Sequence, residues 1–356
     1  MAIVESGGWN GEAAASSACA NDVVGRAAAR VYAALDLGTN NCRLLIARPA
    51  AHGFRVVDSF SRIVRLGEGL SQTGRLSPAA IARTIEALDL CRAKIEQRQA
   101  NRLRLIATQA CRGAENGRAF IDLVRERTGL SLDIVDRESE ALLAAEGCAA
   151  LADPLAQSVV LFDIGGGSSE IVWLDGARGL GLRQRVREWA SLRLGVVSLA
   201  ERFGGASVSA AVFDAMVAFT AQELAPFARA VASLPRCPRF HLLGTSGTVT
   251  TLAGVHLELA RYDRRRVDGL WMTCDAMDAA VDRLRAMSYD ERAANGCIGA
   301  PRADLVLAGA AIMEAIRLAF PARRIRIADR GLREGLLMQM MRDDGVWAGG
   351  SEMGAL

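Results

Sequence analysis

A short strand that ends in aspartate and continues into a turn of small residues occurs twice in this chain of 356 residues. The first copy, LDLGTN, has its aspartate at Asp36, and the second, FDIGGGS, has it at Asp163, 127 residues further on. In each copy an apolar run precedes the aspartate and another follows the turn, which predicts strand, turn and strand. Two copies at this distance indicate a duplicated domain and not a solenoid, whose repeats are far shorter.

The first half of the chain alternates between strand and helix patterns. Ser77 and Pro78 form a helix cap and a first-turn proline, and apolar residues then recur at helical spacing to about residue 99. The predicted strands are the two within 31–49 on either side of a turn at 38–41, then 55–66, 103–107 and 132–135. The predicted helices are 78–99, 116–128, which closes at Gly129, and 138–150. The resulting order is βββαβαβα.

The pattern begins again after Pro154. The second half is predicted to contain strand, turn and strand at 158–175, a strand within 182–189, strands at 240–243 and 325–328, and helices near 207–233, after 247, near 275–294, at 302–319 and from 331. We therefore expect an α/β protein with two domains of this kind. The expected boundaries are a disordered tail at 1–30, domains at 31–150 and 151–345, and a flexible tail at 346–356.

Composition excludes several classes of function. The eight cysteines are spread singly, which is typical of reduced thiols, so we expect a cytoplasmic protein. The three histidines lie far apart in the chain, which gives no support to a zinc triad. No stretch approaches the ~20 apolar residues of a membrane span. The net charge is +3 and the arginines are scattered, so we expect neither a membrane nor a nucleic acid as partner.

Three loops have the features of phosphate-binding sites. The turns after Asp36 and Asp163 expose backbone N–H groups to an anion, and three glycines in the second turn remove every Cβ that would keep phosphate away. A third loop, GTSGT, leads from a strand into a helix, whose N-terminus attracts anions. The candidate substrate-binding residues of these loops are Gly38, Thr39, Asn40, Asn41, Gly165, Gly166, Gly167, Ser168, Gly244, Thr245, Ser246, Gly247 and Thr248. Taken singly, such sequences also form ordinary hairpin turns and helix caps.

Carboxylates accompany these loops. If the two halves pack as pseudo-symmetric copies, Asp36 and Asp163 face each other across a cleft, and such oxygen ligands hold Mg²⁺ or Mn²⁺ beside phosphates. Glu170, on the strand that leaves the second turn, can join them. Glu138 and Glu140 open the helix that follows residue 135. Because residues two apart do not share a helix face, only one of these two can face the cleft and take a proton from water, and the spacing does not choose between them.

Six motifs, in this order over about residues 31–342, resemble those of the exopolyphosphatase and guanosine pentaphosphate phosphohydrolase (Ppx/GppA) family. They are DLGTNN, TQACRGAEN, RESEA, DIGGGSSE, GTSGT and DRGLREG. The resemblance implies the duplicated, ribonuclease H-like fold of actin, sugar kinases and Hsp70, with a cleft between two domains. The chain is similar to the short two-domain form of the family, and we expect a homodimer.

The resemblance also implies roles for individual residues. Glu140 matches the glutamate that activates water, and Arg112 matches an arginine that grips the substrate phosphate. Asp163 and Glu170 match metal-linked acids, and the residues from Asp36 onward match the first phosphate loop. The closing motif at 329–335 is expected to be structural.

The expected function is hydrolysis of the terminal phosphate of inorganic polyphosphate by a water that Glu140 activates, with Mg²⁺ as cofactor. Three alternatives stay open: removal of the γ-phosphate of pppGpp, a kinase or chaperone activity on the same fold, and a non-enzymatic protein that binds polyphosphate or ppGpp.

Overall fold

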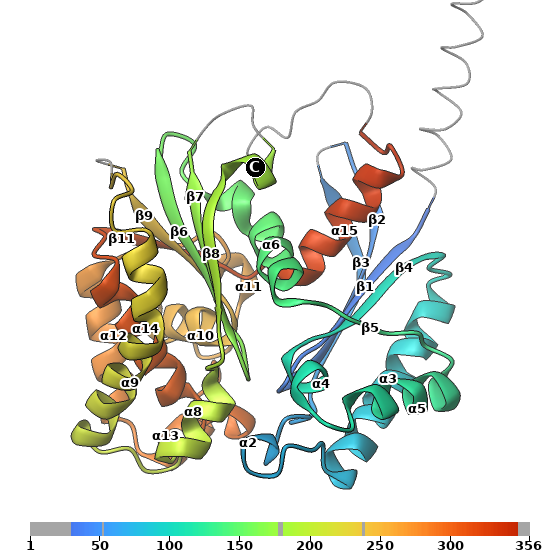
Figure 1. Cartoon of the computed structure of the whole chain (residues 1–356), viewed down its shortest axis with the longest axis horizontal. Coiled ribbons are helices and arrows are strands. Elements are labelled where there is room, and N and C mark those ends of the chain that lie inside the picture. Colours follow the sequence, from blue (N-terminus) through green and yellow to red (C-terminus); the bar gives the residue numbers. More distant parts are fainter. Residues whose placement is uncertain (1–29, 52, 177–180, 237–238, 348–356) are drawn as a thin grey trace, which may run out of the picture.

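The computed structural model describes residues 30–51, 53–176, 181–236 and 239–347, arranged as two α/β domains (Figure 1). The tail expected at 1–30, apart from Arg30, and residues 348–356 of the second expected tail lie outside the described residues. Each domain is built around one mixed sheet, so the duplication that the repeated motif predicts is confirmed.

The two sheets share one strand order. The first runs β3 (Phe54–Ile63), β2 (Asn41–Pro49), β1 (Tyr32–Leu37), β4 (Arg102–Ala107) and β5 (Asp133–Ile134). The second runs β8 (Val186–Leu192), β7 (Ser169–Asp175), β6 (Ser158–Ile164), β9 (His241–Thr245) and β11 (Arg324–Ala328), with β10 (Trp271–Thr273) added at the edge. In the first sheet β3, β2 and β1 pair antiparallel, and β1 pairs in parallel with β4. In the second sheet β8, β7 and β6 pair antiparallel, and β6 pairs in parallel with β9.

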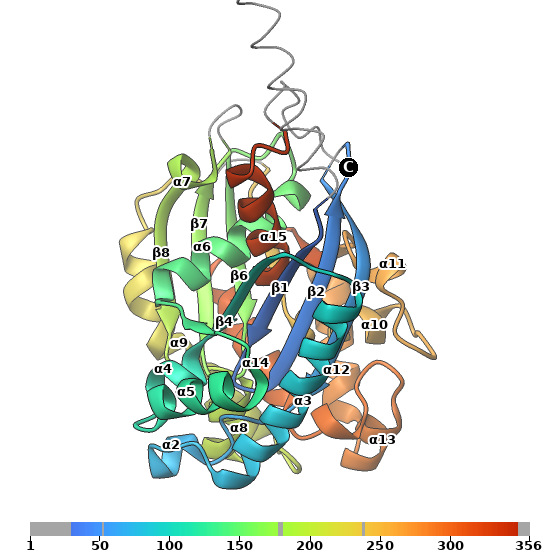
Figure 2. The ribbon, with the colours of Figure 1, turned by 90° about the vertical axis from the view of Figure 1, so that its right-hand side faces the viewer.

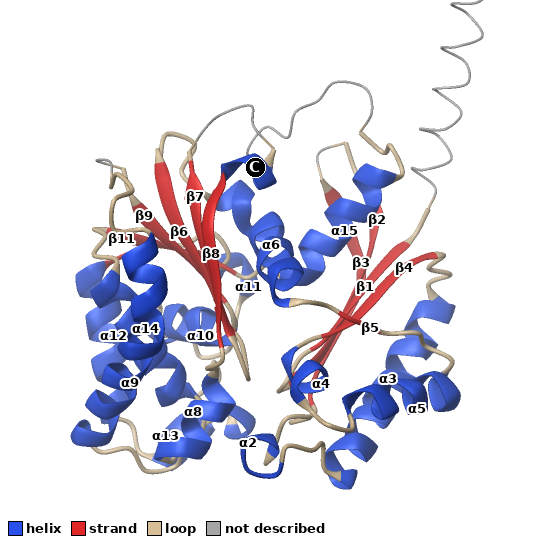
Figure 3. Ribbon diagram, in the orientation of Figure 1, coloured by secondary structure: helices blue, strands red, loops and turns tan. Residues whose placement is uncertain are grey.

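Helices cover the outer face of each sheet (Figure 3). The first domain carries α2 (Leu70–Thr73), α3 (Pro78–Gln97), α4 (Gln109–Gly113), α5 (Gly117–Thr128) and α6 (Arg137–Cys148). The second half of the chain carries α7 (Leu182–Arg185), α8 (Val196–Phe203), α9 (Ala210–Ala230), α10 (Gly247–His256), α11 (Arg264–Val267), α12 (Cys274–Ala286), α13 (Tyr289–Ala294), α14 (Val306–Ala319) and α15 (Leu332–Asp343). Short 3₁₀ turns occupy Ala149–Leu151 and Ala300–Arg302.

The helix caps that the sequence predicts are present. The side chain of Ser77 accepts a hydrogen bond from the backbone N–H of Ala80, and Pro78 occupies the first turn of α3. Helix α5 ends at Gly129, whose φ of 71° is in the left-handed region that favours glycine. The elements that periodicity did not predict are short, namely α2, α4, α7, α8, α11 and β10, and α7 occupies the first part of the range predicted as a strand at 182–189.

The last helix of each half packs on the sheet of the other half, and α6 and α15 lie side by side between the two sheets (Figures 1 and 2). On α15, Leu336 and Met340 pack with Ala34 and Leu45 of the first sheet. On α6, Ala141 and Ala145 belong to a cluster with strands of the second sheet. Helix α15, which the sequence places in the second half of the chain, therefore completes the core of the first domain.

Close contact between α6 and α15 depends on two glycines. A Cβ added at Gly147 of α6 would lie 2.0 Å from the carbonyl oxygen of Gly331, and one added at Gly335 of α15 would lie 2.1 Å from that of Leu143. No side chain fits at either position without moving the backbone of the partner. The two helices are thus held at a fixed separation, which sets the distance between the domains.

Within the described residues, every helix is too short or too polar to cross a membrane.

Candidate active site

A pocket of about 110 Å³ lies between the two domains, and both repeated turns line it. The lining residues that the sequence predicts are Asp36, Gly38, Thr39, Asn40, Asn41, Glu140, Asp163, Gly165, Gly166, Gly167, Ser168, Glu170, Ser246, Gly247 and Thr248. The structure therefore brings Asp36, Asp163 and Glu140 to one cavity. Of the predicted site residues, Arg112, Gly244 and Thr245 do not line it.

The tips of the two repeated hairpins pack against each other. A Cβ added at Gly166 would lie 3.0 Å from the Cβ of Thr39, and one added at Gly167 would lie 2.7 Å from its Oγ1. The first turn therefore carries side chains where the second carries none, and this difference lets the two tips share one pocket. The backbone N–H groups of both turns then lie near the same point.

Burial raises the pKa of the carboxylates in this pocket. Burial raises the pKa of Asp163 to about 6, and the neighbouring Arg43 opposes that shift. Burial also raises the pKa of Asp36 and, to a larger extent, that of Glu170, which lies beside Glu140 and Asp163. Like charges in a buried site disfavour one another, so the site is built to receive positive charge.

Glu140 occupies the first turn of α6 and points into the pocket. Asp136 caps this helix by accepting a hydrogen bond from the backbone N–H of Ser139. Glu140 is 8% exposed, whereas Glu138 is exposed to solvent. Of the two glutamates that the spacing left open, Glu140 is therefore the one that faces the cleft.

Burial raises the pKa of Glu140 to about 7, although Arg112 lowers it, and the charges of Asp36 and Asp163 raise it further. Arg112 Nη2 donates to Glu140 Oε2 at 2.9 Å, and Nη1 donates to the carbonyl oxygen of Val135 at 2.6 Å. The guanidinium of Arg112 therefore fixes the orientation of the glutamate. A carboxyl group with a pKa near neutrality that is held in place in a cleft can act as a general base.

The third loop contributes through its second half. Gly244 and Thr245 belong to strand β9; Gly244 packs on Phe162, and Thr245 donates a hydrogen bond to the carbonyl oxygen of Arg330. Ser246 has φ 121° and ψ 172°, a conformation that residues with side chains rarely adopt. Its hydroxyl accepts from the backbone N–H groups of Thr248 and Val249, so it caps α10 and turns the start of that helix toward the pocket.

Sequence reasoning missed two arginines of the pocket, Arg43 and Arg302. Arg43 stands seven residues after Asp36, as Glu170 stands seven residues after Asp163. Aligning the two repeats would therefore have found Arg43. Arg302 comes from the 3₁₀ turn before α14, where the sequence carries no comparable signal. The remaining lining residues that were not predicted are Thr108, Ile164, Val196, Thr251, Leu305, Val306 and Leu332.

Several buried polar atoms at the site have no hydrogen-bond partner among the described residues. They include the side-chain oxygens of Asn40 and Asn41 and the Nε of Arg112. Buried polar groups are nearly always bonded in folded proteins, so the unbonded oxygens of Asn40 and Asn41, which line the pocket, indicate a polar ligand. An Asn side chain that turns its amide presents N–H donors instead of an oxygen, which suits phosphate.

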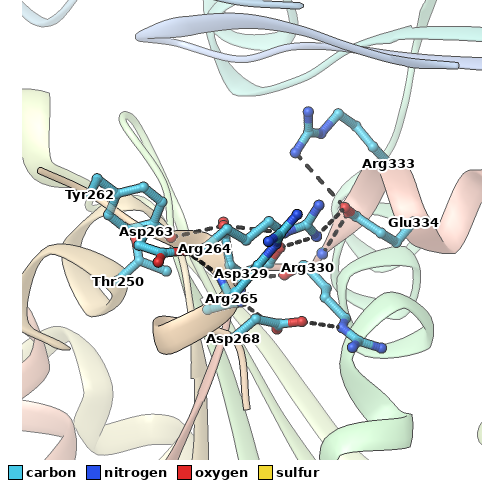
Figure 4. Close-up of polar contacts among 12 residues, drawn as sticks. Thr250, Tyr262, Asp263, Arg264, Arg265, Asp268, Asp329, Arg330, Arg333 and Glu334 are labelled. Carbon is cyan, nitrogen blue, oxygen red and sulfur yellow. Dashed lines mark hydrogen bonds and ion pairs between the residues drawn. The ribbon is translucent and has the colours of Figure 1, made fainter. Parts of the chain in front are cut away.

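The closing motif ties the start of α15 to α11 (Figure 4). Glu334 accepts from the backbone N–H of Gly331 at 2.9 Å and pairs with Arg264 at 3.4 Å. Tyr262 donates its hydroxyl to Asp329 at 2.8 Å, and Asp268 accepts from the backbone N–H of that aspartate at 3.0 Å. This network fixes the segment that crosses from the second sheet to the first.

Carboxylates alone do not form a metal cage at this site. Among the described residues, no three His, Cys, Asp or Glu side chains are grouped so that they could hold a metal ion by themselves. The pocket nevertheless gathers Asp36, Asp163 and Glu170, whose hard oxygens suit Mg²⁺. Because Mg²⁺ in phosphate-handling sites takes one or two carboxylates together with substrate oxygens and water, this donor set fits an ion that the substrate and water complete.

Comparison with known proteins agrees with this geometry. A model of the Ppx/GppA phosphatase family matches residues 45–344. The chain is 29% identical over 323 residues to Exopolyphosphatase 2 of Mycobacterium tuberculosis, which covers 86% of this chain and 98% of the relative.

Solved structures are similar over the same length. The Ppx/GppA family member of Aquifex aeolicus is 27% identical with a TM-score of 0.71, over 88% of this chain and 98% of that one. An exopolyphosphatase from Cytophaga hutchinsonii superimposes with a TM-score of 0.78 at 23% identity, over 90% of this chain and all of that one, and supports the fold alone. The duplicated α/β fold that the resemblance implies is confirmed. The protein is a phosphoanhydride hydrolase that belongs to the Ppx/GppA phosphatase family.

Proposed function

We propose that the protein is an exopolyphosphatase that removes the terminal phosphate of inorganic polyphosphate. The main support is the convergence of two anion-binding turns, Arg43 and Arg302 on a pocket whose buried base is Glu140. In the described part of the chain the pocket is lined by no aromatic side chain that could stack on a guanine. The relative from M. tuberculosis named Exopolyphosphatase 2 points to the same substrate.

In the proposed reaction, water attacks the terminal phosphorus while its proton passes to Glu140. The bond from that phosphorus to the bridging oxygen breaks, and the shortened chain leaves with the electron pair. The N–H groups at 38–41 and 165–168 and the N-terminus of α10 would bind the oxygens of the transferring group. Arg112 would hold Glu140 in line through its hydrogen bond at 2.9 Å.

Asp163 and Glu170, with Asp36 opposite them, would hold Mg²⁺ or Mn²⁺ in this proposal. When bound, the ion supplies positive charge to the oxygens of the transferring phosphoryl group. The buried carboxylates offset that charge and keep it at the catalytic end of the pocket.

Replacing Glu140 tests the proposal directly. Glu140→Gln keeps the shape and the contact with Arg112 but cannot accept a proton, so turnover on polyphosphate should fall ~10² to 10⁴-fold. Phosphate release from the purified variant measures the effect. Glu138→Gln is the matched control, because this glutamate lies on the same helical turn and is exposed. Nearly normal turnover of Glu140→Gln would refute the assignment of the base.

The second candidate substrate is pppGpp, whose terminal phosphate presents the same chemistry. Comparing phosphate release from polyphosphate and from pppGpp in one competition assay separates the two. Binding without phosphate release in the presence of Mg²⁺ would instead support a non-enzymatic role. The cytoplasmic location and the homodimer stay predictions, and sedimentation of the purified protein checks the second.

A further inference from the structure

The active-site pocket is small compared with the cavity next to it. At about 110 Å³ it has room for on the order of ten oxygen-sized atoms, or two to three phosphoryl groups. A second cavity, of about 670 Å³ and more open to solvent, shares the lining residue Arg302 with it. A linear polyanion whose end lies at Glu140 therefore reaches the second cavity once it passes Arg302.

The second cavity is lined mainly by basic side chains. Arg62, Arg65, Arg83 and Arg302 contribute four guanidinium groups, and Glu68 is its one carboxylate among the described residues. The other lining residues are Ser61, Ile63 and Pro301. None of them presents an aromatic face, so the cavity suits repeated phosphates better than a nucleobase.

The carboxylates that pair with these arginines hold them weakly. Arg83 pairs with Glu68 at 2.8 Å, with side chains 42% and 54% exposed. Arg65 pairs with Asp304 of the other domain at 3.1 Å, with side chains 34% and 27% exposed. Exposed ion pairs such as Arg83–Glu68 contribute little to stability, so a phosphate oxygen can replace Glu68 at small cost, whereas the Arg65–Asp304 pair is half-buried. Arg62 is exposed and lies over the ring of Phe60 at 5.6 Å.

The segment 62–67, which carries Arg62 and Arg65, is hydrogen-bonded to the first phosphate loop. The carbonyl oxygen of Asn40 accepts hydrogen bonds from the backbone N–H groups of Val64 and Arg65, at 2.9 and 3.1 Å. Gly67 donates its N–H to the carbonyl oxygen of Thr39 at 2.9 Å. Arg65 also has a φ of 48°, which costs energy for a residue with a side chain. The second cavity and the active site are thus held in one fixed relation.

We propose that the cavity lined by Arg62, Arg65 and Arg83 binds the phosphates of an inorganic polyphosphate chain beyond those that fit the active-site pocket. The inference rests on the proposed function and extends it to chain length. Each phosphate that enters the cavity adds charge-assisted bonds to guanidinium groups, so long chains bind more tightly than tripolyphosphate, most of which fits the inner pocket.

The experiment compares Arg62→Gln and the double variant Arg62→Gln/Arg83→Gln with the unmodified protein. For long-chain polyphosphate, KM should rise about threefold in the single variant and about tenfold in the double one, as expected for lost exposed charge-assisted contacts. For tripolyphosphate KM should stay within about twofold, and kcat should not change for either substrate. Glu68→Gln frees Arg83 of its carboxylate partner and should lower KM for long chains.

Arg92→Gln is the matched control, because Arg92 lies on α3 like Arg83 and forms an exposed ion pair with Glu96 at 2.9 Å, but does not line the cavity. Arg83 also donates to the carbonyl oxygen of Val64, and Arg62→Gln avoids any disturbance of that bond. Equal KM values for long chains in Arg62→Gln and Arg92→Gln would overturn the proposal, as would an equal loss on tripolyphosphate.

Equilibrium binding of long-chain polyphosphate, measured without divalent metal, separates this inference from the proposed function. Suppose that the unmodified protein releases no phosphate in the assay with Mg²⁺, but the double variant binds long chains more weakly than the control. The proposed function is then wrong, and the assignment of the cavity is supported. If polyphosphate is hydrolysed and all three arginine variants bind alike, the cavity assignment fails and the proposed function stands.

Discussion

The two repeated hairpins share one backbone hydrogen-bond pattern but differ in the charges that they carry. Gly38 N–H bonds to the carbonyl oxygen of Asn41 and Gly165 N–H to that of Ser168, both at 2.9 Å. In the first hairpin Asp36 is paired across the strands with Arg43. In the second, Asp163 is paired with Glu170. The residue seven positions after the aspartate therefore decides the charge of the hairpin. The first hairpin presents an acid beside an arginine, and the second presents two acids.

This difference suggests a division of labour within one pocket. An acid balanced by arginine can receive phosphate oxygens, whereas two adjacent buried acids need a cation. The tips differ in the same sense, because Thr39 and Asn40 carry side chains where Gly166 and Gly167 leave room for them. The two hairpins thus share one backbone hydrogen-bond pattern, and the residues that differ between them let their tips pack together and give them different charges.

Neutralising the paired residues should have unequal effects. Glu170→Gln removes one of the two acids of the second hairpin and should lower kcat/KM by ~10² to 10³, the cost of one preorganised electrostatic group. Arg43→Gln should cost about tenfold, mainly in KM, because it removes one charge-assisted contact with substrate. Kinetics over a Mg²⁺ titration measure both. If Arg43→Gln lost the response to Mg²⁺ while Glu170→Gln kept it, the division of labour would be reversed.

Acid pH should lower the activity by protonating Glu140, the proposed general base between the two hairpins. Burial and the charges of Asp36 and Asp163 raise the pKa of Glu140 to about 7, and the base acts only when deprotonated. Activity should therefore be half-maximal near pH 7 and full about one pH unit above it, and log kcat/KM should fall by about one for each pH unit well below pH 7. A pH profile on tripolyphosphate at saturating Mg²⁺ checks this. A flat profile between pH 5 and 7 would contradict the environment described for Glu140.

The equivalent glycines of the two turns should tolerate alanine differently. A Cβ at Gly165 would lie 2.8 Å from the carbonyl oxygen of Ser168, whereas a Cβ at Gly38 would lie 3.5 Å from that of Asn41. Gly165→Ala should lower the free energy of unfolding by about 1 to 3 kcal/mol, and Gly38→Ala by less than about 0.5 kcal/mol. Urea unfolding of both variants measures the difference. Equal losses would show that the turns are packed alike.

The sequence predicts the parts of the molecule that local patterns determine. Strand periodicity and the caps at Ser77 and Gly129 predict their elements, and the repeated acid-tipped strand predicts two sheets. The short elements were not predicted, because a helix of five residues such as α4, or a strand of three such as β10, has too few positions to show a hydrophobic period.

The sequence predicts those residues of the candidate site that lie in the two repeated motifs. Asp36, Asp163 and Glu170 are visible from motif and spacing alone. The choice of Glu140 over Glu138 depends on how α6 is rotated against the second sheet, and the placement of Arg302 depends on a loop far away in sequence. Such features arise from tertiary packing, which no local pattern encodes.

The exchange of α6 and α15 has a consequence for how the chain is made. On the ribosome the first sheet emerges early, but α15, the helix that covers one of its faces, begins only at residue 332. At ~5–20 residues per second, Ala34, Leu45 and Ile106 wait on the order of ten seconds or more for their packing partner. Until then the N-terminal half lacks part of its core, and α15, the last of the described helices, completes that core and packs on α6 at the same time.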